Sequence, residues 1–136
     1  MKASRILETV LYAADLRAAE RFYTSVMGLV VVSRFGDAIA FRCSEGVLLI
    51  FDPERSGSRH RSVPPHGAQG SAHIAFVADG EELADWRRHL AAHGVEIESE
   101  TDWGQARRSI YFRDSADNLV ELAPPDLWFR STPAAS

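Results

Sequence analysis

The sequence has few of the residues that build disulfide frameworks, cysteine-rich metal clusters or membrane spans. Only one of its 136 residues is a cysteine, Cys43, which excludes an intramolecular disulfide framework and a cysteine zinc cluster. A single cysteine fits a reducing compartment, so we expect the protein to be located in the cytoplasm. The first residues, 1–5, lack the apolar segment of a signal peptide, and no apolar run approaches the roughly 18 residues that span a membrane. We therefore expect neither a signal peptide nor a membrane partner.

A large excess of charge of one sign is also missing. The chain has 15 Lys and Arg against 19 Asp and Glu, a formal net charge of −4. This balance argues against nucleic acid as the main partner, because nucleic-acid-binding proteins usually present a basic face. With 46% hydrophobic and 25% charged residues, the composition is that of a globular protein. The length predicts a single domain over residues 1–136.

The predicted elements repeat within the chain. Residues 5–53 and 71–125 both show the order strand, helix, strand, strand, strand, which predicts an α+β fold of two βαβββ modules. The repeat aligns Glu8 with His73, and it aligns Gly28 with Gly94, the glycines that follow the two helices. Asp15 is a good N-cap for the first helix. The predicted strands are 5–14, 29–35, 38–43, 47–51, 71–77, 95–100, 106–113 and 118–123, and the second helix is 81–92.

The segment 54–70 separates the two modules. It is polar and rich in Gly, Pro and Ser, which predicts a loop. Loops of this length are mobile linkers or functional lids. We expect its histidines, His60 and His66, to be solvated, with a role in a lid as the alternative.

Strand alternation separates a bulky apolar face from a face that mixes small residues with a histidine and two carboxylates. The repeat aligns position 8 with 73 and position 49 with 121, which are Glu8, His73, Leu49 and Glu121. A pseudo-two-fold axis between the modules would bring all four together. One imidazole and two carboxylates suit Fe²⁺, Mn²⁺, Ni²⁺ or Zn²⁺, so Glu8, His73 and Glu121 are predicted metal ligands. The alternative is a metal-free pocket in which His73 hydrogen-bonds a carboxylate.

Further residues are candidates for binding a substrate. Tyr111, which shares a face with Ser109, is a candidate donor of a proton or hydrogen bond to substrate, or a core tyrosine. Arg42 either holds an anionic group or is solvated. Phe51 and Trp103 either stack on an aromatic ligand or pack in the ordinary way.

Three motifs carry a resemblance to a known family. They are Leu-Tyr-Ala-Ala-Asp-Leu-Arg-Ala-Ala-Glu-Arg-Phe-Tyr-Thr-Ser-Val-Met-Gly-Leu at 11–29, Ala-His-Ile-Ala-Phe at 72–76, and Tyr-Phe-Arg-Asp at 111–114 leading to Asn-Leu-Val-Glu-Leu at 118–122. Over about residues 5–125 the chain resembles the vicinal oxygen chelate superfamily of glyoxalase I, bleomycin- and fosfomycin-resistance proteins and extradiol dioxygenases. The resemblance implies a cupped mixed β-sheet with helices on its outer face, around a metal and substrate cavity. It also implies a homodimer.

The family's ligand positions fall here on Glu8, Leu49, His73 and Glu121. The first ligand position is usually histidine in the family, but here it is Glu8. Leucine at the second position, Leu49, cannot bind a metal. The loss of this ligand argues against glyoxalase I, which uses four protein ligands, but less against members that use three. The resemblance thus implies a metal-dependent lyase, isomerase or dioxygenase for a small substrate with adjacent oxygens, in which Glu8 and Tyr111 are catalytic. The alternatives are a metal-free dimer that binds a small molecule or antibiotic, and a structural or regulatory homodimer. The predicted substrate-binding residues are Arg42, Leu49, Phe51, Trp103, Ser109 and Tyr111.

Overall fold

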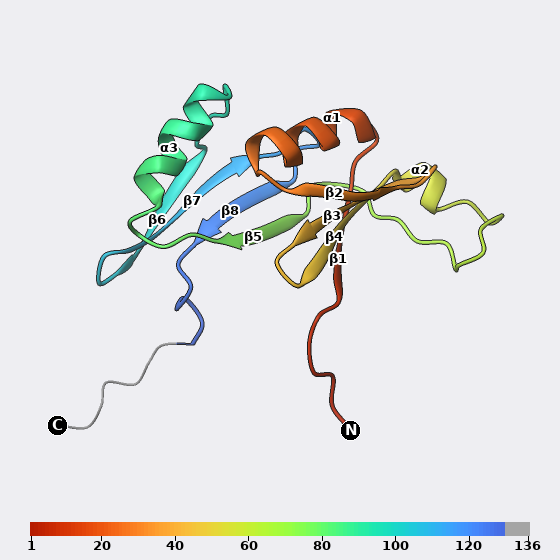
Figure 1. Cartoon of the computed structure of the whole chain (residues 1–136), viewed down its shortest axis with the longest axis horizontal. Helices are drawn as coiled ribbons and strands as arrows, with labels where there is room; N and C mark the ends of the chain where they lie inside the picture. Colours follow the sequence, from red (N-terminus) through yellow and green to blue (C-terminus); the bar gives the residue numbers. More distant parts are fainter. Residues whose placement is uncertain (130–136) are drawn as a thin grey trace. The chain divides into compact units, whose positions relative to one another are not determined.

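The computed structural model describes residues 1–129 as two compact units (Figure 1). The first unit comprises Met1–Ala72 together with Asp114–Asn118, and the second comprises His73–Arg113 and the chain from Leu119 onward. Each unit holds a four-stranded mixed sheet with helices, which confirms the predicted α+β class of two modules. No helix within residues 1–129 is both long and apolar enough to cross a bilayer.

The first sheet has the strand order β1-β4-β3-β2, in which β1 runs parallel to β4 and the other pairs are antiparallel. Its helix α1 (Leu16–Arg21) begins where the carboxylate of Asp15 accepts a hydrogen bond from the amide of Ala18, as the capping preference predicts. It continues as the π-helical η1 (Phe22–Val26), whose C-cap is Met27, and Gly28 follows with a φ of +70°. The strands are β1 (Glu8–Tyr12), β2 (Val30–Arg34), β3 (Ala38–Cys43) and β4 (Gly46–Phe51).

The second sheet repeats this plan in the order β5-β8-β7-β6, with α3 (Leu83–Ala92) between β5 and β6 along the chain. The strand predicted at 95–100 begins later than predicted, because the amide of Val95 bonds back to the helical carbonyl of Leu90 and strand pairing begins at Ser99. A short helix, α2 (Pro53–Ser56), was also not predicted; Asp52 caps it. The strands are β5 (His73–Val77), β6 (Ser99–Gly104), β7 (Arg107–Arg113) and β8 (Leu119–Ala123).

Equivalent strands of the two sheets pair in the same register. Glu8 pairs with Val47 in the first sheet, and His73 pairs with Leu119 in the second. Two residues further along β4 and β8 stand Leu49 and Glu121. The alignment of positions 8 with 73 and 49 with 121 therefore holds within the sheets themselves.

A buried hydrogen-bond network holds the turn between β7 and β8. The fully buried phenol of Tyr23 donates to Asp114 at 2.7 Å, and burial first, then the nearby carboxylate, raises the pKa of Tyr23 far above its usual range. Asp114 in turn accepts from the amide and the side chain of Asn118. Asn118 also donates to the carbonyl of Tyr12 and accepts from the amide of Ala72. The turn thus connects the end of β1 to the residues that immediately precede β5 and β8.

The long loop after α2 is tied to the first sheet. His60 is exposed as predicted, but the solvated state predicted for His66 is wrong. The Nδ1 atom of His66 lies 2.7 Å from the hydroxyl of Tyr12, and its ring meets Phe51 edge-on at 4.6 Å. The guanidinium of Arg61 lies 5.6 Å from the centroid of Phe51. Aromatic and hydrogen-bonding contacts therefore anchor this loop.

Candidate functional site

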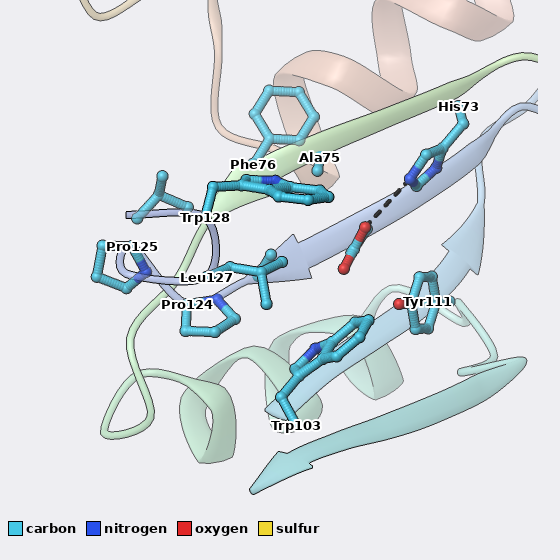
Figure 2. Close-up of a pocket in the computed structure, with 12 residues that line it drawn as sticks. His73, Ala75, Phe76, Trp103, Tyr111, Pro124, Pro125, Leu127 and Trp128 are labelled. Carbon is cyan, nitrogen blue, oxygen red and sulfur yellow. Dashed lines mark hydrogen bonds and ion pairs between the residues drawn. The ribbon is translucent and has the colours of Figure 1, made fainter. Parts of the chain in front are cut away.

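The second unit contains a pocket of about 450 Å³ on one face of its sheet (Figure 2). A cavity of this size can enclose a small organic ligand. Its walls come from β5, β6, β7, β8 and the segment that follows β8. The lining residues are His73, Ala75, Phe76, Val77, Trp103, Tyr111, Glu121, Ala123, Pro124, Pro125, Leu127 and Trp128.

His73 and Glu121 meet in this pocket. The parallel register pairs His73 with Leu119 and Ala75 with Glu121, which places the two polar side chains on one face of adjacent strands. The Nδ1 atom of His73 lies 3.0 Å from the carbonyl oxygen of Leu119, and Nε2 lies 3.1 Å from Oε2 of Glu121 (Figure 2). The contact between His73 and Glu121 is the one expected in the metal-free alternative. Nε2 of His73 and Oε2 of Glu121 are also candidate donors to a metal.

The hydrogen bonds of His73 define its chemistry. A carbonyl oxygen only accepts, so Nδ1 must carry the proton in its bond to Leu119. In the neutral ring, Nε2 then presents a lone pair toward a carboxylate oxygen of Glu121. These two atoms attract one another only when a proton or another cation lies between them. A histidine whose second nitrogen donates to a backbone carbonyl is also the usual arrangement in metal sites.

Glu121 is a buried carboxylate with incomplete hydrogen bonding. Its side chain is only 8% exposed, and within residues 1–129 its Oε1 atom has no hydrogen-bond partner. A buried polar atom without a hydrogen-bond partner lowers the stability of the folded state. A proton, a cation or a hydrogen-bond donor of a ligand would satisfy this oxygen. One imidazole nitrogen and one carboxylate oxygen are donors that suit the divalent metals named above. The donor set therefore fits a metal, although no three His, Cys, Asp or Glu residues are grouped for metal binding in the part of the chain described.

Tyr111, Trp103 and Ser109 lie beside this pair. Tyr111 is the register partner of Glu121 on β7, and its ring centroid is 6.4 Å from that of His73. The indole Nε1 of Trp103 donates to the fully buried hydroxyl of Ser109 at 2.8 Å. Tyr111 and Trp103 line the pocket, whereas Ser109 lies behind the indole and holds it in place.

The remaining predicted site residues belong to the first unit. Glu8 and Arg42 are both exposed, and both pair with Val47, so they lie in one row on one face of that sheet. Leu49 is buried, and Phe51 is half-buried against the loop that follows α2. Convergence of these four side chains with those of the second unit remains a prediction.

Sequence reasoning missed the wall formed after β8. Pro124, Pro125, Leu127 and Trp128 all line the pocket. The signal was the apolar cluster at 127–129, which follows two prolines and an aspartate and which strand periodicity alone does not connect with a site. Phe76 is also among the residues that line the pocket.

Comparison with known proteins identifies the family. Residues 5–122 match the model of the Glyoxalase/Bleomycin resistance protein/Dioxygenase superfamily. The chain belongs to this superfamily. The resemblance inferred from the sequence motifs is thereby confirmed.

Relatives within the superfamily carry different activities in their names. A lactoylglutathione lyase from Agrobacterium tumefaciens is 38% identical with a TM-score of 0.89, over 96% of this chain and all of that one. A proposed ring-cleaving dioxygenase, MhqO of Bacillus subtilis (strain 168), is 31% identical over 74% of this chain. The chain spans about a third (32%) of the length of that curated relative. FosX, a fosfomycin resistance protein of Listeria monocytogenes, shares the fold at 23% identity and a TM-score of 0.72, over 93% of this chain and 97% of that one. Superfamily membership therefore does not select a reaction.

Proposed function

We propose that this protein is a divalent-metal-dependent enzyme of lyase or isomerase type that acts on a small substrate with adjacent oxygens. The observation that carries the proposal is the contact between Nε2 of His73 and the buried carboxylate of Glu121, whose other oxygen has no partner in residues 1–129. Similarity to a lactoylglutathione lyase favours the lyase or isomerase type. A dioxygenase reaction is the alternative that the match to MhqO supports.

The proposed ligands are Glu8, His73 and Glu121. His73 is oriented by its bond to the carbonyl of Leu119 and presents Nε2, and Glu121 presents its carboxylate from β8. Glu8 is proposed as the third ligand because its register position in β1 is the one that His73 has in β5. It would come from the same chain or from a second copy in a homodimer. A divalent ion held there supplies Lewis acidity to the adjacent oxygens of a substrate.

The chain's own residues would perform the remaining chemistry. Tyr111 lines the pocket and can donate a hydrogen bond from its phenol to a substrate oxygen. The exposed carboxylate of Glu8 can accept a proton from the substrate. Leu49 offers no ligand at the position equivalent to Glu121, so we propose a site of three protein ligands rather than four. For that reason we do not expect lactoylglutathione lyase activity.

Metal titration tests this proposal. Chelator-treated protein is titrated by calorimetry with Mn²⁺, Fe²⁺, Ni²⁺ or Zn²⁺ in turn, and one site of micromolar or tighter affinity is expected. Glu121→Gln removes a charged ligand, so its affinity should fall by more than the roughly 10–100-fold typical of outer-shell changes. Glu96→Gln, which changes an exposed carboxylate between α3 and β6, should leave the affinity unchanged. Absence of micromolar binding, or equal binding by Glu121→Gln, would refute the metal site.

A metal-free binding protein is the second candidate. The contact between His73 and Glu121 favours it, because one shared proton satisfies this contact without any metal. In that case Glu121→Gln should retain small-molecule binding, and added metal should change neither affinity nor turnover. Sedimentation of the wild-type protein would show whether it is the dimer that either candidate expects.

A further inference from the structure

The helix α3 carries a row of polar and aromatic side chains outside the pocket described above. Positions 82, 85, 86, 89 and 93 are three or four residues apart, so at 3.6 residues per turn they follow one face of the helix and its two caps. These residues are Glu82, Asp85, Trp86, His89 and His93. All except His93 line a surface hollow of about 370 Å³. The face therefore combines two carboxylates with two imidazoles.

His89 and His93 stand on successive turns at the end of this helix. Their ring centroids are 4.3 Å apart. A spacing of four residues is the one with which a helix offers two imidazoles to one metal ion. Metal–nitrogen bonds of ~2.0–2.1 Å place two such nitrogens roughly 3 Å apart, a separation that these neighbouring rings can reach. The pair can therefore chelate one ion without a change in the backbone of α3.

The backbone orients the ring of His93. Its Nδ1 atom lies 2.9 Å from the carbonyl oxygen of His89. Since a carbonyl oxygen only accepts, Nδ1 carries the proton, and in the neutral ring Nε2 presents a lone pair. A bond from the second nitrogen to a backbone carbonyl is the arrangement found in metal-binding histidines. His93 therefore has the tautomer that a metal ligand requires.

The charges around the pair favour a cation. His93 is the C-cap of α3, so the pair lies at the negative end of the helix dipole. Glu82 and Asp85 add carboxylates to the adjoining hollow. The guanidinium of Arg88 pairs with Asp85, and both side chains are exposed, so this pair offsets only part of the negative charge.

We propose that His89 and His93 form a surface site for one divalent transition-metal ion, distinct from the site proposed at His73 and Glu121. Imidazole donors suit Cu²⁺, Ni²⁺ and Zn²⁺ rather than Mg²⁺ or Ca²⁺, and Cu²⁺ should bind most tightly. Water would complete the coordination. With two protein ligands, this site should bind Ni²⁺ and Zn²⁺ more weakly than the proposed site of three ligands. A bound ion would connect the last two turns of α3.

Fluorescence titration with Cu²⁺ tests this proposal, because Cu²⁺ quenches an indole that lies close to it. The ring of Trp86 meets that of His89 edge-on, with centroids 5.6 Å apart. Saturable quenching is therefore expected in the wild-type protein, and Trp86→Phe should lose it. His93→Gln changes an exposed side chain and should keep the fold.

Variants of the two histidines locate the ion. His89→Gln and His93→Gln should each weaken Cu²⁺ binding by at least about tenfold, since loss of a ligand costs more than an outer-shell change. His60→Gln is the matched control, because His60 is exposed and has no histidine four residues away. It should leave the affinity unchanged. Equal Cu²⁺ binding by the wild-type protein and His93→Gln would overturn the proposal.

Glu121→Gln separates this site from the proposed function. If quenching of Trp86 persists in Glu121→Gln and is lost in His93→Gln, the site on α3 is supported whether or not the pocket binds a metal. Copper in the pocket would instead quench Trp103, which lines it. If quenching depends on Glu121 and Trp103 but not on His93 and Trp86, the metal lies in the pocket and the site on α3 is refuted.

Discussion

Replacing Tyr23 by phenylalanine tests whether one buried hydrogen bond holds the turn that leads into β8. The phenol of Tyr23 is fully buried and donates to Asp114 at 2.7 Å. Phenylalanine keeps the ring and opens no sizeable cavity, so the change isolates the hydroxyl. A hydrogen bond to a charged group contributes about 1.5–3 kcal/mol. Because Asp114 keeps its bonds from the amide and side chain of Asn118, we expect a loss of about 2 kcal/mol.

Urea unfolding followed by circular dichroism at pH 7 measures this loss. The midpoint should fall while the m-value stays unchanged, since the buried surface hardly changes. In thermal unfolding, the entropy of a chain of 136 residues converts 2 kcal/mol into a lower midpoint by about 7 °C. A loss below about 0.5 kcal/mol would refute the reasoning, because that is the range of neutral surface changes.

The same bond predicts a dependence on pH. Burial, and then the carboxylate of Asp114, raises the pKa of Tyr23 far above its ordinary value of 10.0. The folded state therefore keeps the phenol neutral, while the unfolded chain ionises it above about pH 10. Its contribution is complete below pH 10 and falls as the pH rises further, by at most about 1.4 kcal/mol per pH unit.

The difference in stability between the wild-type protein and Tyr23→Phe should therefore shrink above pH 10. Tyr12→Phe is the control, because the hydroxyl of Tyr12 bonds to His66 in a half-buried position. It should cost about 1 kcal/mol or less. A constant difference between wild type and Tyr23→Phe from pH 7 to 11 would contradict the buried neutral phenol.

Two further changes test local structure. Asp15→Ala removes the N-cap of α1 and should lower the free energy of unfolding by about 1 kcal/mol, measured in urea; no loss would contradict the capping role. In the turn between β6 and β7, Gln105 and Ala106 both have left-handed backbones, with φ of +55° and +59°. The double change to Asn-Gly should raise stability by about 1 kcal/mol, because these residues favour that conformation. A lower thermal midpoint for this variant would contradict the turn assignment.

Local patterns in the sequence were enough to predict most of the fold. The boundaries of β3 match the prediction, and Asp15 caps the first helix as expected. Strand alternation and the internal repeat predicted that His73 and Glu121 would share a face, and the parallel pairing of β5 with β8 brings them into contact. These features depend on short-range periodicity and on a repeated register.

Features that depend on contacts between distant residues were not predictable in this way. His66 is held by Tyr12, 54 positions earlier, so the polar composition of its loop does not show that it is anchored. A local contact was also missed: the strand expected at 95–100 begins at Ser99, because the amide of Val95 bonds to the carbonyl of Leu90 at the end of α3, only five positions earlier. Trp128 lines the pocket only because the chain after β8 passes beside that sheet.

The two modules repeat their backbone register but not their chemistry. Glu8 and Leu49 occupy the positions that His73 and Glu121 occupy in the second module. A carboxylate and an aliphatic side chain cannot form the hydrogen-bonded pair that the second module forms. In the proposed metal site, the second module would therefore supply two donors by itself, and the first module could add only one carboxylate at these positions. Glu8→Gln should therefore only weaken the affinity of the proposed site for a divalent metal, because His73 and Glu121 still bind it. Replacement of either His73 or Glu121 should weaken metal binding further, because it removes one of the two donors of the second module.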